Sequence, residues 1–153
     1  MSTDGTPHNM PRHKMFAVLA VATAVELHAG VATFGDLGHI VDLKPAETGL
    51  VMLRGRIGGD GAPFNVGEAT VTKAVVRLAG GEIGYGFRLG RDVDATRAAA
   101  ILDALWQSTH ARERIETTVL APIRARLEAS RAEASAETAG TRVNFFTLAR
   151  EAT

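Results

Sequence analysis

The segment from Arg54 to Gly61 holds the residue types best suited to binding an anion. Its sequence is Arg-Gly-Arg-Ile-Gly-Gly-Asp-Gly. Neighbouring glycines expose backbone N–H groups, and the planar guanidinium of arginine pairs bidentately with phosphate or carboxylate. The segment lacks the glycine-to-lysine spacing of a P-loop and the three-glycine dinucleotide fingerprint, and it leads into a strand, whereas both devices need the amino terminus of a helix. A tight turn therefore explains the segment better than a phosphate site, and both interpretations stay open.

Four basic side chains are candidates for phosphate binding or for a protein interface. The candidates are Arg54, Arg56, Lys73 and Arg91. Arg54 and Arg56 are two residues apart in a predicted strand, so they share one face of it, and Lys73 and Arg77 share a face of another. Solvated charges on a sheet surface give the same pattern. The four residues are therefore hypotheses for a ligand site or an interface site.

The remaining residues form no recognisable catalytic or metal-binding pattern. The five histidines lack the i, i+4 pairing of a helical metal site, and the serines lie outside any nucleophile-elbow sequence. The chain contains no cysteine, which excludes disulfides, thiolate metal sites and iron–sulfur ligation by this chain. We therefore predict no catalytic residue, no metal site and no cofactor held by this chain.

Charge and hydropathy narrow the classes of partner. Seventeen basic residues balance seventeen acidic ones, so the chain has no basic field of the kind that binds nucleic acid.

The apolar run from Met15 to Ala22 follows a basic stretch and mimics a secretory signal, with Ala22-Thr23-Ala24 as a possible cleavage site. Against a signal, Asp4 precedes the run, which also continues into Glu26 in a helical pattern. It is too short to span a bilayer, so we expect no membrane association.

The elements that would position these residues predict an α+β fold, with an antiparallel sheet of about four strands packed against helices. Two helical stretches lie between Lys14 and Phe34. The predicted strands form two hairpins, 39–44 with 49–57 and 69–79 with 82–88. Pro45 and its neighbours would turn the first hairpin, and Gly80-Gly81 would turn the second. Asp92 or Asp94 would cap the next helix, whose apolar face must dock on the sheet.

The carboxyl-terminal third changes character twice. A helix is predicted from about Ala111, and Pro122 would kink it or open a second segment. Residues 124–140 are mostly Ala, Glu, Arg and Ser, which is typical of an exposed helical arm. An apolar tail from Val143 to Leu148 follows, and its partner-docking candidates are Phe145, Phe146 and Leu148. The alternative is that the tail completes the core of its own domain.

These patterns divide the chain into three parts. Residues 1–13 are a polar, disordered lead-in, residues 14–123 are the α+β core domain, and residues 124–153 are the arm and tail.

Several motifs occur in a fixed order along the chain: AETGLV from residue 46, RGRIGGDGAPFNVGEATVTKAVVRL from 54, GYGFRLGRD from 84 and DALWQ from 103. Their order and spacing resemble the PhnG family of the bacterial carbon–phosphorus lyase core complex. KMFAVLAVA near the start and RVNFFTLAR near the end extend this resemblance over residues 14–150.

The resemblance implies a non-catalytic or accessory subunit of a cytoplasmic hetero-oligomer in phosphonate catabolism. It implies PhnI, PhnH and PhnJ as core partners, with PhnK and PhnL associated. The complex would convert ATP and an alkylphosphonate such as methylphosphonate to α-D-ribose 1-methylphosphonate 5-triphosphate and adenine. PhnJ would carry the iron–sulfur cluster and use S-adenosylmethionine. No catalytic residue is transferred to this chain, and a stand-alone phosphate-binding enzyme or module, or a secreted binding module, remains the alternative.

Overall fold

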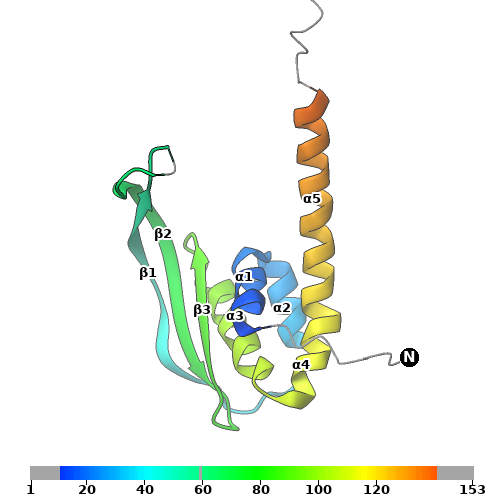
Figure 1. The fold of residues 1–153 in the computed structure, drawn as a ribbon. Coiled ribbons are helices and arrows are strands. Elements are labelled where there is room, and N and C mark those ends of the chain that lie inside the picture. The colour runs from blue at the N-terminus through cyan, green and yellow to red at the C-terminus, as the bar shows by residue number, and fades with distance from the viewer. Residues whose placement is uncertain (1–10, 59, 141–153) are drawn as a thin grey trace, which may run out of the picture. The chain divides into compact units, whose positions relative to one another are not determined.

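The computed structural model describes residues 11–58 and 60–140. Its elements, in order, are α1 (Arg12–Val21), α2 (Ala24–Ala32), β1 (Val41–Gly55), β2 (Phe64–Arg77), β3 (Ile83–Leu89), α3 (Val93–Trp106), α4 (Thr109–Ile115), a π-helical turn (Glu116–Leu120) and α5 (Ala121–Gly140) (Figure 1). The strands form an antiparallel sheet in the order β1-β2-β3. The α+β class is therefore confirmed, with three strands in the described part of the chain instead of about four. The chain divides after Ile123 into two compact units.

The first predicted hairpin is wrong, because residues 39–44 and 49–57 do not pair with each other. Most of each segment lies in the single strand β1, which pairs with β2 over its length. Pro45 sits where the register shifts between Lys44 opposite Val75 and Glu47 opposite Lys73, so β1 carries one extra residue there. Because β1 is an edge strand, the missing N–H of proline interrupts no inner ladder. Pro45 therefore makes a bulge in one strand and not a turn between two.

The second predicted hairpin is confirmed. The N–H of Leu78 donates to the carbonyl of Glu82 at 2.9 Å, and the N–H of Gly81 donates to the carbonyl of Leu78 at 2.9 Å. Only Gly81 of the glycine pair has a positive φ, at 98°. The returning strand β3 pairs with β2 only from Arg77 back to Val71. The remainder of β2, toward the loop, therefore has β1 as its only neighbouring strand.

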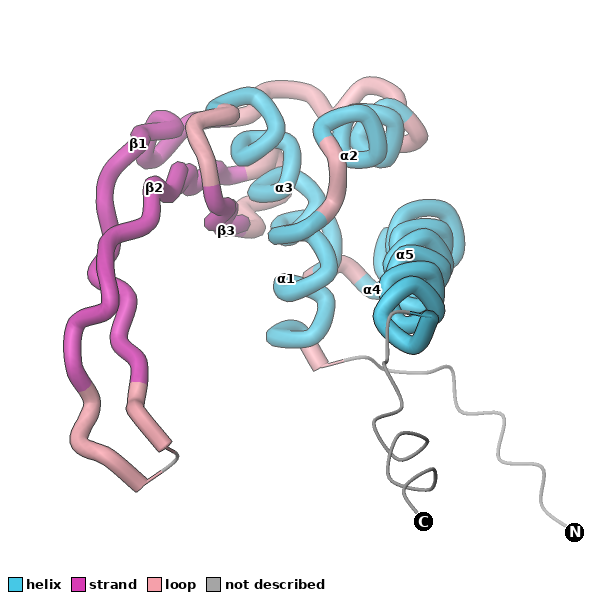
Figure 2. Tube along the Cα trace, turned by 90° about the horizontal axis from the view of Figure 1, so that it is seen from above, coloured by secondary structure: helices cyan, strands magenta, loops and turns pink. Residues whose placement is uncertain are grey.

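One face of the sheet is covered by α3, whose side chains are nearly all buried. Asp92 caps this helix by accepting the N–H of Ala95 at 2.9 Å, as one of the two predicted caps. Gly84 and Gly86 of β3 face the helix, and a Cβ at either position would overlap backbone carbonyl oxygens of α3. Glycine is thus required for this close approach. Helices α1, α2 and α3 all lie on the same side of the sheet (Figure 2).

The apolar run near the amino terminus contributes to this core. Helix α1 begins at Arg12, two residues before the expected boundary, and buries Met15, Leu19 and the following Ala22. Thr23 then starts α2 with a capping box, in which its hydroxyl accepts the N–H of Glu26 and the Glu26 carboxylate accepts the N–H of Thr23. No helix in the described part of the chain combines the length and the apolar character needed to cross a membrane.

The helical segment after residue 109 is interrupted as Pro122 predicts. Proline has no N–H to give to the carbonyl four residues earlier, and the chain passes through a π-helical turn before α5 begins at Ala121. Helix α5 continues to Gly140, which confirms a helix over the predicted arm, and its side chains from Glu128 to Thr138 are exposed. The tail with Phe145, Phe146 and Leu148 lies outside the described residues.

Candidate interaction surfaces

The four basic candidates lie at separate places on the sheet. Arg54 is near the end of β1, Arg56 follows that strand, Lys73 is in the middle of β2 and Arg91 follows β3. Lys73 lies opposite Glu47, seven residues along β1 from Arg54, which corresponds to about 23 Å. One phosphate group cannot bridge that distance. The geometry therefore separates Lys73 from Arg54, and the role of all four residues stays a prediction.

Lys73 already takes part in a surface ion-pair cluster. The Glu47 carboxylate lies 2.8 Å from the Nζ of Lys44 and 3.9 Å from the Nζ of Lys73. The hydrogen bond from Lys44 lowers the pKa of Glu47, and the charge of Lys73 adds to this effect. Because all three side chains are about half exposed, the cluster is screened by solvent and contributes little to stability. The Glu47 carboxylate nevertheless serves as a counterion for Lys73 within the same chain.

A charge pair that joins three elements, with a buried carboxylate, was not predicted from the sequence. Asp103 of α3 is fully buried, and its carboxylate accepts hydrogen bonds from Arg12 Nε at 2.9 Å and Arg12 Nη2 at 2.6 Å. The same carboxylate accepts the N–H of Tyr85 at 2.8 Å. The hydrogen bond to Asp103 raises the pKa of Arg12, whose guanidinium also lies 5.8 Å from the centre of the Tyr85 ring. A charged residue within the apolar stripe of α3 was the available sequence signal.

This pair closes the free edge of the sheet. The N–H of Tyr85 points away from β2, and Asp103 accepts it in place of a fourth strand. Gln107, one turn further along α3, donates to the carbonyl of Ile83 at 2.6 Å on the same edge. Such coverage protects β3 from pairing with a foreign strand. The outer edge of the hairpin formed by β1 and β2 has no corresponding cover within the described residues.

Arg88 of β3 holds the carboxyl-terminal end of α1, whereas Arg12 lies at the amino-terminal end of that helix. The Arg88 guanidinium donates to the carbonyl of Leu19 at 2.6 Å and to that of Ala22 at 2.7 Å, so it satisfies the carboxyl-terminal end of α1. Burial lowers the pKa of Arg88, and the charge of Asp92 partly opposes this effect. Arg88 therefore serves the fold. Although it lies inside the GYGFRLGRD motif, Nη1 and Nη2 both donate to backbone carbonyls, and its buried Nε has no hydrogen-bond partner among the described residues.

A shallow depression of about 280 Å³ lies between α2 and α3. It is lined by His28, Val31, Asp94, Arg97, Ala98 and Ile101. The Nε of Arg97 is bonded to Asp42 at 2.7 Å, so its charge is already partnered. Among residues 11–58 and 60–140, no three His, Asp or Glu side chains gather as the ligands of a metal ion would. The depression offers no organised set of ligand contacts.

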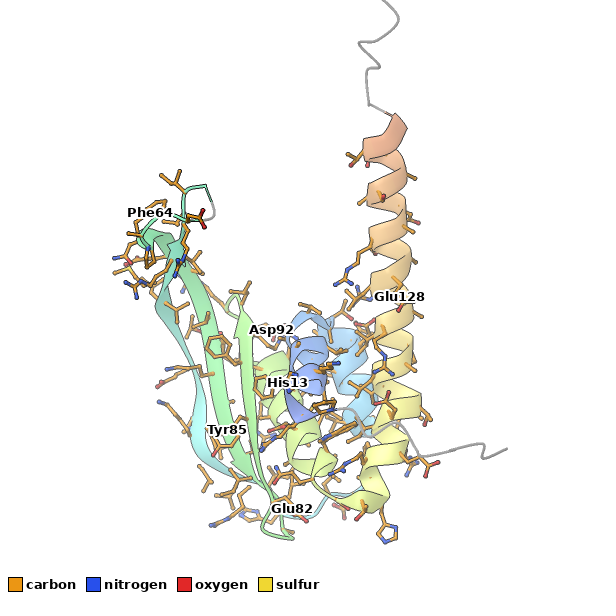
Figure 3. The ribbon with its side chains drawn as sticks, viewed as in Figure 1. His13, Phe64, Glu82, Tyr85, Asp92 and Glu128 are labelled. Carbon is orange, nitrogen blue, oxygen red and sulfur yellow. The ribbon has the colours of Figure 1, made fainter. Side chains whose placement is uncertain are left out.

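Exposed apolar side chains are concentrated on the strands. On β3, the residues that face away from α3 are Ile83, Tyr85, Phe87 and Leu89, and all four are exposed. On the β1–β2 hairpin, the exposed large apolar residues are Leu43, Leu50, Met52, Leu53, Phe64 and Val66. Figure 3 shows Phe64 beside the loop that joins β1 to β2 and Tyr85 within the three-stranded part of the sheet. These side chains lie on both faces of the sheet, and exposed apolar side chains in such numbers are typical of a protein interaction site.

Comparison with known proteins identifies relatives over most of the chain. Residues 10–151 match the family model described as phosphonate metabolism protein PhnG. A protein of Rhizobium meliloti (strain 1021), the alpha-D-ribose 1-methylphosphonate 5-triphosphate synthase subunit PhnG, is 46% identical over 139 residues. The aligned region covers 91% of this chain and 88% of the relative.

Proposed function

The chain belongs to the PhnG family of phosphonate metabolism proteins, and on this basis we propose that it is an accessory subunit of an α-D-ribose 1-methylphosphonate 5-triphosphate synthase. The Rhizobium meliloti relative is named as a subunit of that enzyme, and the similarity extends over both units of the chain. A subunit needs a surface that associates with other chains. The exposed apolar side chains of the β1–β2 hairpin and β3 support such an association, and the family match carries the proposal.

The charged groups of the first unit support an accessory role, because several already have structural tasks. Asp92 caps α3, Asp103 binds Arg12 and the edge of β3, and Arg88 binds the end of α1. A group that transfers protons or attacks a substrate must be accessible and free to change its partners. These three side chains are held by the fold instead. We propose that the catalytic groups of the complex lie on other chains.

We further propose PhnI, PhnH and PhnJ as the core partners, with PhnK and PhnL associated, in a cytoplasmic complex. In this proposal, the complex displaces adenine from ATP with methylphosphonate and forms α-D-ribose 1-methylphosphonate 5-triphosphate. This chain brings no cofactor of its own, and PhnJ supplies the iron–sulfur cluster and the S-adenosylmethionine chemistry of the later step. These assignments rest on membership of the family and on the name of the relative.

Co-expression with the other subunits tests the proposal. Native mass spectrometry should find this chain in a complex with PhnI, PhnH and PhnJ. Adenine release from ATP with methylphosphonate should require this chain to be present with the other subunits, and the purified chain alone should release none. Release by the chain alone would contradict an accessory role. Full activity of a complex that lacks the chain, together with failure of the chain to co-purify, would contradict its being a subunit.

A further inference from the structure

Strands β1 and β2 continue beyond the end of β3 as a two-stranded ribbon, which comprises residues 50–55 and 64–70 (Figures 1 and 2). The N–H of Gly90 bonds to the carbonyl of Thr70 at 2.9 Å, and this is the last contact that the β3 side makes with β2. Past this point, neither edge of the ribbon pairs with a described strand. A two-stranded hairpin alone is only marginally stable in water, and its open edges are templates for pairing.

Both faces of the ribbon carry exposed apolar side chains. Leu50 and Met52, which lie opposite Thr70 and Glu68, share one face and are 63% and 60% exposed. Leu53, one residue further along β1, points to the opposite face and is 46% exposed. Phe64 and Val66 of β2 are exposed as well. An ordinary surface hairpin is apolar on one face only, so both faces of this one require a cover.

From these features we propose that the ribbon inserts into a groove of another subunit of the synthase, which covers both ribbon faces and pairs with at least one ribbon edge. This inference rests on the proposed function. A second copy of the chain fits less well, because a twofold contact uses the same patch on both copies, and a flat contact of that kind covers only one face of each ribbon. The other face would remain exposed. An enclosing groove covers both.

The charged side chains of the ribbon and of the loop at its end indicate which charges a partner would present around them. Arg54, Asp60 and Glu68 make no ion pair within residues 11–58 and 60–140, and neither does Arg56 just beyond the end of β1. Arg54 and Arg56 are also the basic residues at the loop end of the hairpin. In this proposal, the groove presents carboxylates to the two arginines and donors to the two acids, around an apolar floor. An apolar centre with a polar rim is the usual anatomy of an interface.

Single lysine substitutions on the two faces test this proposal. The variants are Leu50→Lys and Leu53→Lys, and the matched control is Val25→Lys, since Val25 lies on α2 and is 78% exposed. Each full-length variant is co-expressed with PhnI, PhnH and PhnJ, and its retention in the purified complex is measured by native mass spectrometry. Both ribbon variants should lose retention at least roughly tenfold, because a charge enters a desolvated contact, and the control should be retained.

Thermal unfolding of each isolated chain shows whether the variants fold, and unchanged midpoints are expected because these side chains are exposed in the free chain. If only one ribbon variant loses the partner, the contact is flat and the groove is refuted. If the isolated chain is a dimer that Leu50→Lys dissociates while the complex still forms, the occupant is a second copy. If both variants assemble normally, the ribbon proposal fails while the proposed function stands. If the unmodified chain does not co-purify, both fail.

Discussion

Replacing Arg12 with alanine should lower the free energy of unfolding by about 3 kcal/mol. The substitution removes two hydrogen bonds, of 2.9 and 2.6 Å, from a carboxylate that has no exposed surface. Removing one partner of a buried ion pair costs about 3–5 kcal/mol, because the other charge stays buried. The side chain of Arg12 is itself 46% exposed, so solvent screening places the expected loss at the lower end of that range.

Arg12→Ala is then combined with a second substitution, Asp103→Asn, in a double variant. Asparagine has nearly the same shape as aspartate, and its carbonyl oxygen can still accept the N–H of Tyr85, which Asp103 accepts at 2.8 Å. With Arg12 removed, asparagine leaves no charge buried in α3. The double variant should therefore be more stable than Arg12→Ala alone, by roughly 1–2 kcal/mol, even though it carries one more substitution.

Urea unfolding of the full-length chain provides the measurement. Trp106 is the only tryptophan and is 3% exposed, so its fluorescence reports the loss of the core around α3. Arg97→Ala is the control, because the Arg97–Asp42 pair has a similar distance, 2.7 Å, but side chains that are 36% and 38% exposed. That variant should lose less than about 1 kcal/mol. The reasoning is refuted if Arg12→Ala costs no more than the control, or if the double variant is less stable than Arg12→Ala.

Two further predictions concern packing and the tail. Gly84→Ala should lower the free energy of unfolding in urea by about 3 kcal/mol or more, because its Cβ would overlap the carbonyl oxygen of Ala100. The control Gly49→Ala should lower it little, because no atom lies within 4 Å of a Cβ at that position. Equal losses would contradict the close approach of β3 and α3. Truncation after Gly140 should leave the unfolding of the isolated chain nearly unchanged but abolish co-purification with PhnI, whereas a large loss of stability would place Phe145 and Phe146 in the chain's own core.

The features that the sequence predicted correctly are those with local causes. Gly80-Gly81, which follows a β-branched run, sets the turn of the β2–β3 hairpin, and Asp92 sits three residues before the N–H that it caps. Pro122 interrupts the carboxyl-terminal helices because of its own missing N–H. Each of these signals acts within one turn of the chain. No knowledge of distant segments is needed to interpret them.

The features that the sequence did not predict depend on distant segments. Pro45 was interpreted as a turn, because proline is excluded from inner strands, and nothing local says that β1 is an edge strand. The partners of Asp103 are equally remote, since Arg12 is 91 positions away and Tyr85 is 18 positions away. A charge in an apolar helix face predicts that a partner exists. It does not identify the partner.

The ribbon shows the same limit at the level of the complex. Residues 50–53, Leu-Val-Met-Leu, form an unbroken apolar run, which is the pattern of a strand buried on both faces. In the isolated chain, Leu50 and Met52 on one face and Leu53 on the other are all exposed. An apolar run predicts that both faces of a strand are buried, but it does not identify the chain that buries them. The mismatch between this apolar run and its exposed faces is therefore the observation from which we propose that another subunit covers the ribbon.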